Sequence, residues 1–374
     1  MNGRAAIFYG VEQRFALQEL PTPEVEPGGV LVRVNAAGIC GSDLHYWRGD
    51  NPLPVAVGEP GPVIPGHEFT GVVHTLGQGI TTDSLGRPLK EGDQVAFPYF
   101  FPCMRCYNCM RGELHACPYR ATRTAVKNYP YCHGGYADFF YLKPGHFVFK
   151  APDELSKETL VPVNCALAQV TFALHRADLH VGDTVVVQGA GGLGLNAVAV
   201  AREMGAGQVI AIDAQDRRLE LALRCGATDT ININELPHAD ARIRRVLELT
   251  SGRGADVVME VVGFPQVVLE GLQMLRLGGV YLEIGHITPN SSMTLDVNLV
   301  VRRQIRFLGI QHYNPWIIPA ALDFLVRTRE RYPLAEVTSD TFPLEHINEA
   351  FEAAEWLGRE GGTRVTRAVV TMLQ

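Results

Sequence analysis

The sequence predicts an α/β protein in two parts, a β-rich first part followed by a doubly wound parallel sheet. Its 374 residues are more than one ordinary hydrophobic core holds. The first 150 residues alternate short apolar runs with Gly/Pro turns, and from about residue 165 strand patterns alternate with helical patterns. With 47% hydrophobic and 20% charged residues and no low-complexity tract, the composition is that of a globular protein.

Short strands are predicted in the first part wherever an apolar run lies between turn residues. Helical periodicity is scarce there, so this part is expected to be mostly β. The four predicted strands lie within GGVLVRVNAAGIC (28–40), TGVVHTLG (70–77), GDQVAFPYF (92–100) and GGYADFFYL (134–142).

Strands and helices alternate in the second part, which is the pattern of a parallel sheet covered by helices. Two of the helices are expected to close on glycine, at Gly205 and Gly226. Strands are predicted at 184–188, 208–213, 255–263 and 280–285, and helices at 195–206, 217–227 and 266–279. Near the C-terminus, a helix is predicted at 346–358 and a strand at 366–373.

Several classes of partner and location are disfavoured by the charge and the apolar runs. A net charge of -7 without a long Lys/Arg run argues against a nucleic-acid partner. The apolar stretch TVVVQGAGGLGLNAVAVA contains Gln188, Asn196 and four glycines, so it is interpreted as strand, turn and helix rather than a membrane span. The N-terminus lacks the apolar core of a secretory signal. We therefore expect a cytoplasmic protein with reduced cysteines and no membrane partner.

A glycine-rich turn between a predicted strand and a predicted helix indicates a dinucleotide site. Gly189, Gly191 and Gly194 form G-x-G-x-x-G, which lets a pyrophosphate approach the N–H groups at the helix N-terminus. Asp213 ends the next strand, where a carboxylate accepts hydrogen bonds from ribose hydroxyls and repels a 2′-phosphate, which favours NAD over NADP. A tight turn with a surface Asp is the alternative. The remaining residues assigned to this site are Gly192, Leu193 and Arg218.

Four of the eight cysteines lie in one short segment, CMRCYNCMRGELHAC. The spacing C-x2-C-x2-C-x7-C lets four thiolates converge on one tetrahedral ion, usually Zn²⁺. An iron–sulfur cluster is the rival, since Pro118 follows the last cysteine as in ferredoxins. A disulfide is a weaker alternative. Four protein ligands leave no position for a substrate, so this site is expected to be structural. Its ligands would be Cys103, Cys106, Cys109 and Cys117.

The order of several motifs resembles the zinc-dependent medium-chain alcohol and polyol dehydrogenases over essentially the whole chain. These motifs are GICGSDLH, GHEFTG, the four-cysteine segment, and GAGGLG followed by ID. The resemblance implies a GroES-like β-rich catalytic domain at residues 1–165, completed by 310–374, and a Rossmann NAD-binding domain at 166–309. It places the active site in the cleft between them.

The resemblance also implies a second zinc site, which is catalytic. Cys40 and His67 match zinc ligands, and Cys165 stands 24 residues before Gly189, where the family has its third ligand. These three residues imply a Cys₂His set with an open fourth position. Glu68 matches an alternative or outer zinc ligand, and Asp43 matches the outer partner of the histidine. Without the resemblance, each residue has an ordinary interpretation as a core cysteine or a hydrogen-bonded histidine.

Two further residues match the family's proton relay. The resemblance implies that zinc polarises an alcohol oxygen and that hydride passes to the nicotinamide. The hydroxyl proton would leave through Ser42 and then His45, by way of the nicotinamide ribose. Gly41 stands where some members carry a phosphate-binding Arg, so the helix N-terminus and Arg367 are expected to meet the pyrophosphate charge.

The predicted activity is therefore reversible oxidation of a primary or secondary alcohol by NAD, with two zinc ions per chain. The alternatives are a polyol or sugar dehydrogenase, a zinc-free enone or quinone reductase, and a non-catalytic NAD-binding protein. A homodimer or homotetramer is expected, with GGVYLEIG (278–285) as the edge strand of the pairing. The segments 47–68 and 119–140 are expected to border the substrate, with Trp47 and Phe69 either lining it or lying in the core.

Overall fold

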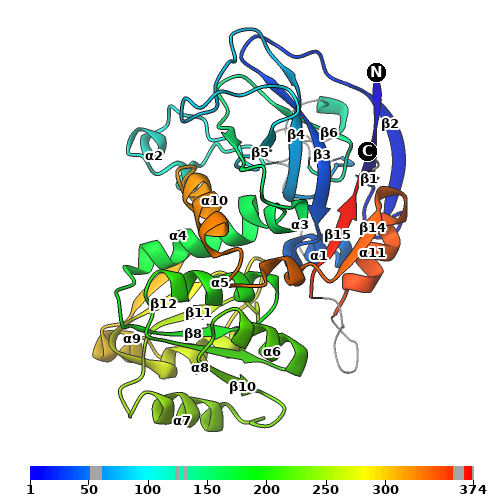
Figure 1. The fold of residues 1–374 in the computed structure, drawn as a ribbon. Helices are drawn as coiled ribbons and strands as arrows, with labels where there is room; N and C mark the ends of the chain where they lie inside the picture. The colour runs from blue at the N-terminus through cyan, green and yellow to red at the C-terminus, as the bar shows by residue number, and fades with distance from the viewer. Residues whose placement is uncertain (51–60, 123–125, 130–133, 357–365, 373–374) are drawn as a thin grey trace. The chain divides into compact units, whose positions relative to one another are not determined.

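The computed structural model describes residues 1–50, 61–122, 126–129, 134–356 and 366–372 (Figure 1). The chain divides into two compact units. Unit 1 comprises residues 1–168, 314–327 and 338–374, and unit 2 comprises residues 169–313 and 328–337. The predicted α/β class, with a β-rich part and a doubly wound parallel sheet, is confirmed. No helix in the described part of the chain is long and apolar enough to cross a membrane.

Unit 1 is built on a seven-stranded sheet in the order β14-β15-β3-β4-β5-β7, with β6 paired to β3, and on a two-stranded sheet of β1 and β2. The strands near the C-terminus therefore lie in the same sheet as the early ones, because β15 pairs with β3. The strands of this unit are β1 (Asn2–Phe8), β2 (Phe15–Pro21), β3 (Val30–Gly38), β4 (Glu68–Leu76), β5 (Gln94–Ala96), β6 (Phe139–Leu142), β7 (Phe149–Lys150), β14 (Asp340–Pro343) and β15 (Ala368–Thr371).

Aromatic side chains fill the core of unit 1. Phe69 is buried and packs edge-on against Phe97 and Phe140. Trp47 is buried against Phe15 and Phe351. Of the two alternatives for Trp47 and Phe69, the structure therefore shows the core position. The parts of the two predicted bordering segments at 51–60, 123–125 and 130–133 lie outside the described residues.

Short helices connect the strands of unit 1 and cover its sheet. The helices wholly within this unit are α1 (Gly41–Arg48), α2 (Tyr107–Met110), α3 (Lys157–Leu160) and α11 (Ile347–Ala354). A π-helical turn, Val163–Leu167, runs into α4 (Ala168–Ala177), and α10 (Ile317–Thr328) ends where the chain passes from unit 1 to unit 2 at residue 328. Short 3₁₀ turns of this unit lie at Leu114–Ala116, Val126–Asn128 and Leu344–His346, and one of unit 2 lies at Leu334–Val337.

Unit 2 is a six-stranded, fully parallel sheet in the order β10-β9-β8-β11-β12-β13. The chain runs outward from β8 to β10 and then restarts at β11 on the other side of β8, which is the doubly wound order of dinucleotide-binding folds. The strands are β8 (Thr184–Gln188), β9 (Gln208–Asp213), β10 (Asp229–Asn232), β11 (Ala255–Glu260), β12 (Leu275–Glu283) and β13 (Arg306–Gly309). The helices are α5 (Gly192–Glu203), α6 (Asp216–Arg224), α7 (Ala239–Leu249), α8 (Pro265–Met274) and α9 (Val297–Arg303).

Glycine ends two helices of unit 2 as predicted, because Gly205 and Gly226 have φ of +103° and +107°. The predicted helix over 266–279 is too long. It ends at Met274, and Leu275 already pairs with Ala255 as the first residue of β12. Gly278, with a φ of +74°, is incompatible with a continuing helix.

The predicted edge strand is wrong. The segment 278–285 falls largely in β12, which lies between β11 and β13, so β13 is the edge of the sheet. Strand β13 has only four residues, RFLG, and three of them are exposed. Four residues are too few to show the period-two apolar pattern of a strand, so the sequence does not indicate it.

Candidate active site and metal centres

Cys40, His67 and Cys165 converge in unit 1, with their ligand atoms all within 4.8 Å of one another. The first two meet because β3 and β4 are antiparallel neighbours with Gly38 opposite Glu68. Cys40 follows the end of β3, and His67 precedes the start of β4, so both lie at the same end of the strand pair. Three ligands of this type on one side of an ion leave a fourth position open, as in catalytic zinc sites.

Cys165 reaches this group from the π-helical turn Val163–Leu167. Wide turns of this kind occur often at functional sites, since they redirect a side chain within a helical path. The turn is fixed to β4 by Asn164, whose Oδ1 accepts a hydrogen bond of 3.2 Å from the backbone N of Phe69. Cys165 itself is buried. Cys165 is therefore held, through its neighbour Asn164, to β4, the strand that begins directly after His67.

Asp43 orients His67 from behind. Its Oδ1 lies 3.4 Å from Nδ1 of His67, which leaves Nε2 for the site. Asp43 is buried, and its Oδ2 accepts hydrogen bonds from the backbone N of Cys40 at 3.2 Å and from the Tyr136 hydroxyl at 3.1 Å. A carboxylate holding the far nitrogen of a histidine is the usual support of a metal ligand.

The three ligand residues affect one another's pKa values, and Asp43 affects that of His67. The hydrogen bond between Cys40 and Cys165 lowers the pKa of Cys40 well below its usual value and raises that of Cys165 well above it. Burial opposes a charge on His67, but the negative charges of Asp43 and Cys40 raise its pKa to about 10. A divalent ion bound here would favour the thiolate forms of the cysteines and the neutral imidazole, because metal ligands must be deprotonated.

Glu68 and Arg367 form a buried ion pair beside this group. Both side chains are almost fully buried. Burial raises the pKa of Glu68 to about 7, against the opposing charge of Arg367. Glu68 is not among the ligand atoms that cluster within 4.8 Å, and its carboxylate pairs with Arg367.

Ser42 and His45 lie on one face of α1, three residues apart. The Ser42 hydroxyl is 3.3 Å from Nε2 of His67. Nδ1 of His45 is 3.2 Å from Oδ2 of Asp50 and 3.0 Å from Nη2 of Arg48. Burial and the Arg48 charge lower the pKa of His45.

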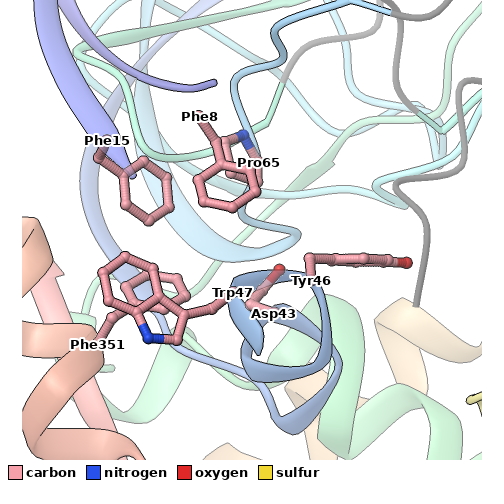
Figure 2. Close-up of a pocket in the computed structure, with 7 residues that line it drawn as sticks. All are labelled: Phe8, Phe15, Asp43, Tyr46, Trp47, Pro65 and Phe351. Carbon is pink, nitrogen blue, oxygen red and sulfur yellow. The ribbon is translucent and has the colours of Figure 1, made fainter. Parts of the chain in front are cut away.

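An aromatic cluster anchors α1 to the core. Figure 2 shows Trp47 reaching from this helix toward Phe15 and Phe351, while the Tyr46 side chain leaves the same helix in a different direction. The ring centroids of Trp47 and Phe351 are 5.1 Å apart. A helix held by a buried Trp presents Ser42 and His45 from a fixed position.

The four-cysteine segment forms a separate group in unit 1. The ligand atoms of Cys103, Cys106, Cys109 and Cys117 all lie within 4.8 Å of one another. Cys109 and Cys117 are buried, and the other two are half-buried. Sγ of Cys106 is 3.9 Å from Sγ of Cys117, which accepts a hydrogen bond from the backbone N of Cys103 at 3.3 Å. Four sulfurs at this separation fit one tetrahedral ion.

In unit 2, the backbone geometry explains why glycine stands at each of the three positions of the G-x-G-x-x-G turn. Gly189 has a φ of +101°, which makes the turn after β8. Gly191 is the N-cap of α5, and a Cβ there would meet nothing within 4 Å, so the backbone is open to a ligand. A Cβ on Gly194 would lie 1.8 Å from the carbonyl oxygen of Gly189, so only glycine allows the helix this close.

Asp213 lies at the end of β9 beside this turn. Its Oδ2 accepts a hydrogen bond of 2.7 Å from the backbone N of Ala190, and Oδ1 accepts from Ala214 and Gln215. Nη1 of Arg218 lies 3.9 Å from Oδ2 of Asp213. The structure thus brings the predicted acid, the predicted arginine and the glycine turn, with Gly192 and Leu193 at its helix start, into one region.

A third cluster of titratable groups, which is not among the predicted sites, is formed by Glu260, Glu283 and His286 in unit 2. Their ligand-type atoms lie within 4.8 Å of one another. The two glutamates end the adjacent strands β11 and β12. The signal in the sequence was an acid at the end of each of two successive apolar strands, a place where parallel sheets gather side chains.

The chain matches two models of known domains. Residues 26–153 match the alcohol dehydrogenase GroES-like domain, and residues 192–327 match the zinc-binding dehydrogenase domain. Among curated proteins, 5-exo-hydroxycamphor dehydrogenase of Pseudomonas putida is 34% identical over 93% of this chain and 94% of its own. Sorbitol dehydrogenase of Bacillus subtilis is 31% identical over 94% of both chains.

Solved structures show the same relationship. An alcohol dehydrogenase from Thermotoga maritima superimposes with a TM-score of 0.88 and 29% identity over 100% of both chains. One from Thermus sp. ATN1 has a TM-score of 0.82 and 29% identity over 99% of this chain and 100% of its own. This chain belongs to the zinc-dependent medium-chain dehydrogenase/reductase family, as an oxidoreductase of its alcohol and polyol dehydrogenase group with an NAD(P)-binding fold.

Proposed function

We propose that the protein is an NAD-dependent alcohol dehydrogenase that interconverts a primary or secondary alcohol and the corresponding aldehyde or ketone. The observation that supports this most is the convergence of Cys40, His67 and Cys165, three ligands with an open position. We also propose that residues 1–165 with 310–374 are the catalytic domain and that residues 166–309 are the coenzyme domain.

The donor set fits zinc at both cysteine sites. Two sulfurs and an imidazole nitrogen within 4.8 Å suit a zinc ion with one open position, and four sulfurs suit a closed one. A zinc ion held by Cys40, His67 and Cys165 would supply Lewis acidity toward an alcohol or carbonyl oxygen. We propose that Glu68 does not bind the zinc ion directly. Its carboxylate pairs with Arg367, so the pair adds no net charge next to the thiolates.

The glycine turn and Asp213 fit NAD. The open N-cap of α5 offers backbone N–H groups to a pyrophosphate, and Asp213 offers carboxylate oxygens to the ribose of the adenosine half. A bound nicotinamide would supply the hydride acceptor. We keep Gly192, Leu193, Arg218 and Arg367 as proposed coenzyme contacts, with Arg367 the weakest of them because Glu68 already pairs with it.

Ser42 and His45 are proposed to carry the proton of the substrate hydroxyl. Ser42 stands 3.3 Å from His67, within reach of an oxygen that approaches the same ligand group. His45 follows one helical turn later on the same face. Its lowered pKa keeps the imidazole neutral at pH 7, so it is ready to accept a proton.

A polyol is the second candidate substrate. Several relatives carry polyol names, among them sorbitol dehydrogenase of Bacillus subtilis and an erythritol/L-threitol dehydrogenase of Mycolicibacterium smegmatis at 32% identity. A polyol dehydrogenase would use the same zinc ligands and relay, and it would differ in the contacts to the neighbouring hydroxyls.

Location and assembly complete the proposal. We propose a cytoplasmic location, where cysteines stay reduced and available to bind zinc. Strand β13 is an exposed sheet edge, and we propose that it pairs with a second copy in a homodimer or within a homotetramer.

An alcohol panel tests the proposal. Purified protein is mixed with NAD or NADP and with simple alcohols, secondary alcohols and sugar alcohols, and the absorbance of reduced nicotinamide is followed. The proposal predicts turnover with NAD and at least one alcohol. A preference for NADP contradicts the role of Asp213, and zinc-loaded protein that binds NAD but oxidises no alcohol supports the non-catalytic alternative.

A further inference from the structure

Two carboxylates stand side by side at the carboxyl end of the parallel sheet in unit 2. Glu260 ends β11, Glu283 ends β12, and the two residues are direct partners across the strands. Like charges directly opposite one another on adjacent strands destabilise a sheet. Where a natural sequence departs from the ordinary preferences for charge and packing, the departure is often at a functional site.

His286 lies between the two carboxylates. Its Nδ1 is 2.9 Å from Oε1 of Glu283 and 3.4 Å from Oε2 of Glu260. Oε1 of Glu260 also accepts hydrogen bonds of 2.5 Å and 2.6 Å from the backbone N–H groups of Val262 and Gly263. The cluster therefore joins the loop after β11 to the loop after β12.

The hydrogen bonds of this cluster are incomplete within the described part of the chain. Oε2 of Glu283 and Nε2 of His286 are buried and have no hydrogen-bond partner there. Both side chains keep 15% of their surface exposed, whereas Glu260 is fully buried beneath them. Buried polar atoms without partners are costly, so a ligand that supplies a donor and an acceptor would be favoured at this place.

The strand order indicates which part of a dinucleotide would lie at this cluster. A doubly wound sheet consists of two mononucleotide-binding halves, here β8–β9–β10 and β11–β12–β13. Asp213 ends β9, the second strand of the first half, and Glu283 ends β12, the second strand of the second half. Glu283 therefore holds the position in the second half that Asp213 holds in the first.

We propose that Glu283 and His286 bind the nicotinamide riboside half of the coenzyme, and that Glu260 positions His286. This inference rests on the proposed use of NAD. The nicotinamide riboside offers the groups that the cluster lacks: ribose hydroxyls, a carboxamide that both donates and accepts, and a cationic ring in the oxidised form. Carboxylates favour that cation, and hydrogen bonds to charged groups are the strong ones.

The two halves of the coenzyme can be tested separately with NAD⁺ and with ADP, which lacks the nicotinamide riboside. Dissociation constants are measured by calorimetry on zinc-loaded protein. Glu283→Gln should weaken NAD⁺ about tenfold and leave ADP within about twofold, because only one charge-assisted contact is lost. Asp213→Asn should weaken both ligands. His238→Ala, at an exposed position before α7, should change neither.

The outcomes separate this inference from the proposed function. If Glu283→Gln leaves NAD⁺ binding unchanged, or weakens ADP as much as NAD⁺, the inference is wrong while NAD binding stands. If the unaltered protein binds neither ligand, the proposed use of NAD is wrong. Should Glu283→Gln not fold, as judged by its thermal unfolding, His286→Gln carries the same test with the same expected selectivity.

Discussion

The two cysteine sites of unit 1 contain similar atoms in different surroundings. The ligands of one lie between residues 103 and 117, whereas those of the other run from residue 40 to residue 165. The first site has four sulfurs and sits partly at the surface. The second has three ligands, with Asp43 behind His67, Ser42 beside it and a buried Glu68–Arg367 pair next to it. A full ligand set favours a structural role, and an incomplete set with proton-carrying neighbours favours chemistry.

The largest expected effect is at the open site. Cys165→Ala should lower kcat/KM more than about a thousandfold, since Lewis acidity contributes several kcal/mol to such reactions. The thermal unfolding temperature should change by only a few degrees, and zinc content should fall from two ions to one. Steady-state kinetics, calorimetry and elemental analysis measure the three quantities. Cys225→Ala, which alters a buried cysteine of unit 2, is the matched control and should keep its activity.

A smaller effect is expected at the proton relay. His45→Gln should lower kcat roughly a hundredfold, within the usual range for a lost general base. The pKa of His45 is lowered below its ordinary value of 6.5 by burial and Arg48, so the imidazole is neutral at pH 7 and becomes protonated only in acid. Alcohol oxidation should therefore fall as the pH drops through that pKa. This acidic limb should disappear from the pH profile of His45→Gln; if it persists unchanged, another group carries the proton.

The support behind His67 should matter less than the ligands themselves. Asp43→Asn keeps the size of the side chain but removes the charge that faces Nδ1 of His67. Zinc affinity should weaken roughly ten- to a hundredfold, the usual range for such outer partners. Competition with a zinc indicator measures it. Unchanged affinity would mean that Asp43 acts only in packing.

The smallest effect on turnover is expected at the four-cysteine site. Cys109→Ser should lose one zinc ion and lower the unfolding temperature by roughly 10 °C, because structural zinc contributes directly to folding. Turnover per folded molecule should stay within about threefold. The isolated protein should be colourless, and visible absorbance with bound iron would favour the iron–sulfur alternative. If Cys109→Ser folds but has no activity, the assignment of a purely structural role to the four-cysteine site is wrong.

Local patterns made most of the fold predictable. The alternation of strands and helices indicated the parallel sheet, and the glycines after α5 and α6 marked both helix ends. Strand β13 was missed because four residues are too few to show the period-two apolar pattern of a strand. The end of α8 was placed too late because the apolar run continues from the helix directly into β12.

The candidate sites differ in how many of their residues could be predicted from the sequence alone. Spacing was enough to group Cys103 with its three neighbours, since a short segment can bring four ligands together by itself. Cys40, His67 and Cys165 meet only through the pairing of β3 with β4 and through a π-helical turn, so only the resemblance indicated them. Glu260 and Glu283 become neighbours through the register of β11 and β12, and the sequence shows only an acid at the end of each of the two apolar strands.

Stepwise removal of zinc tests the contrast between the two sites most directly. The protein is dialysed against increasing concentrations of a chelator, and zinc content, turnover and unfolding temperature are measured on the same samples. An open site should release its ion first, so we predict a one-zinc form that has no activity, keeps nearly the full unfolding temperature and regains turnover when zinc is restored. A one-zinc form that keeps full turnover, or that unfolds as the first ion leaves, would contradict the assignment of catalysis to Cys40, His67 and Cys165.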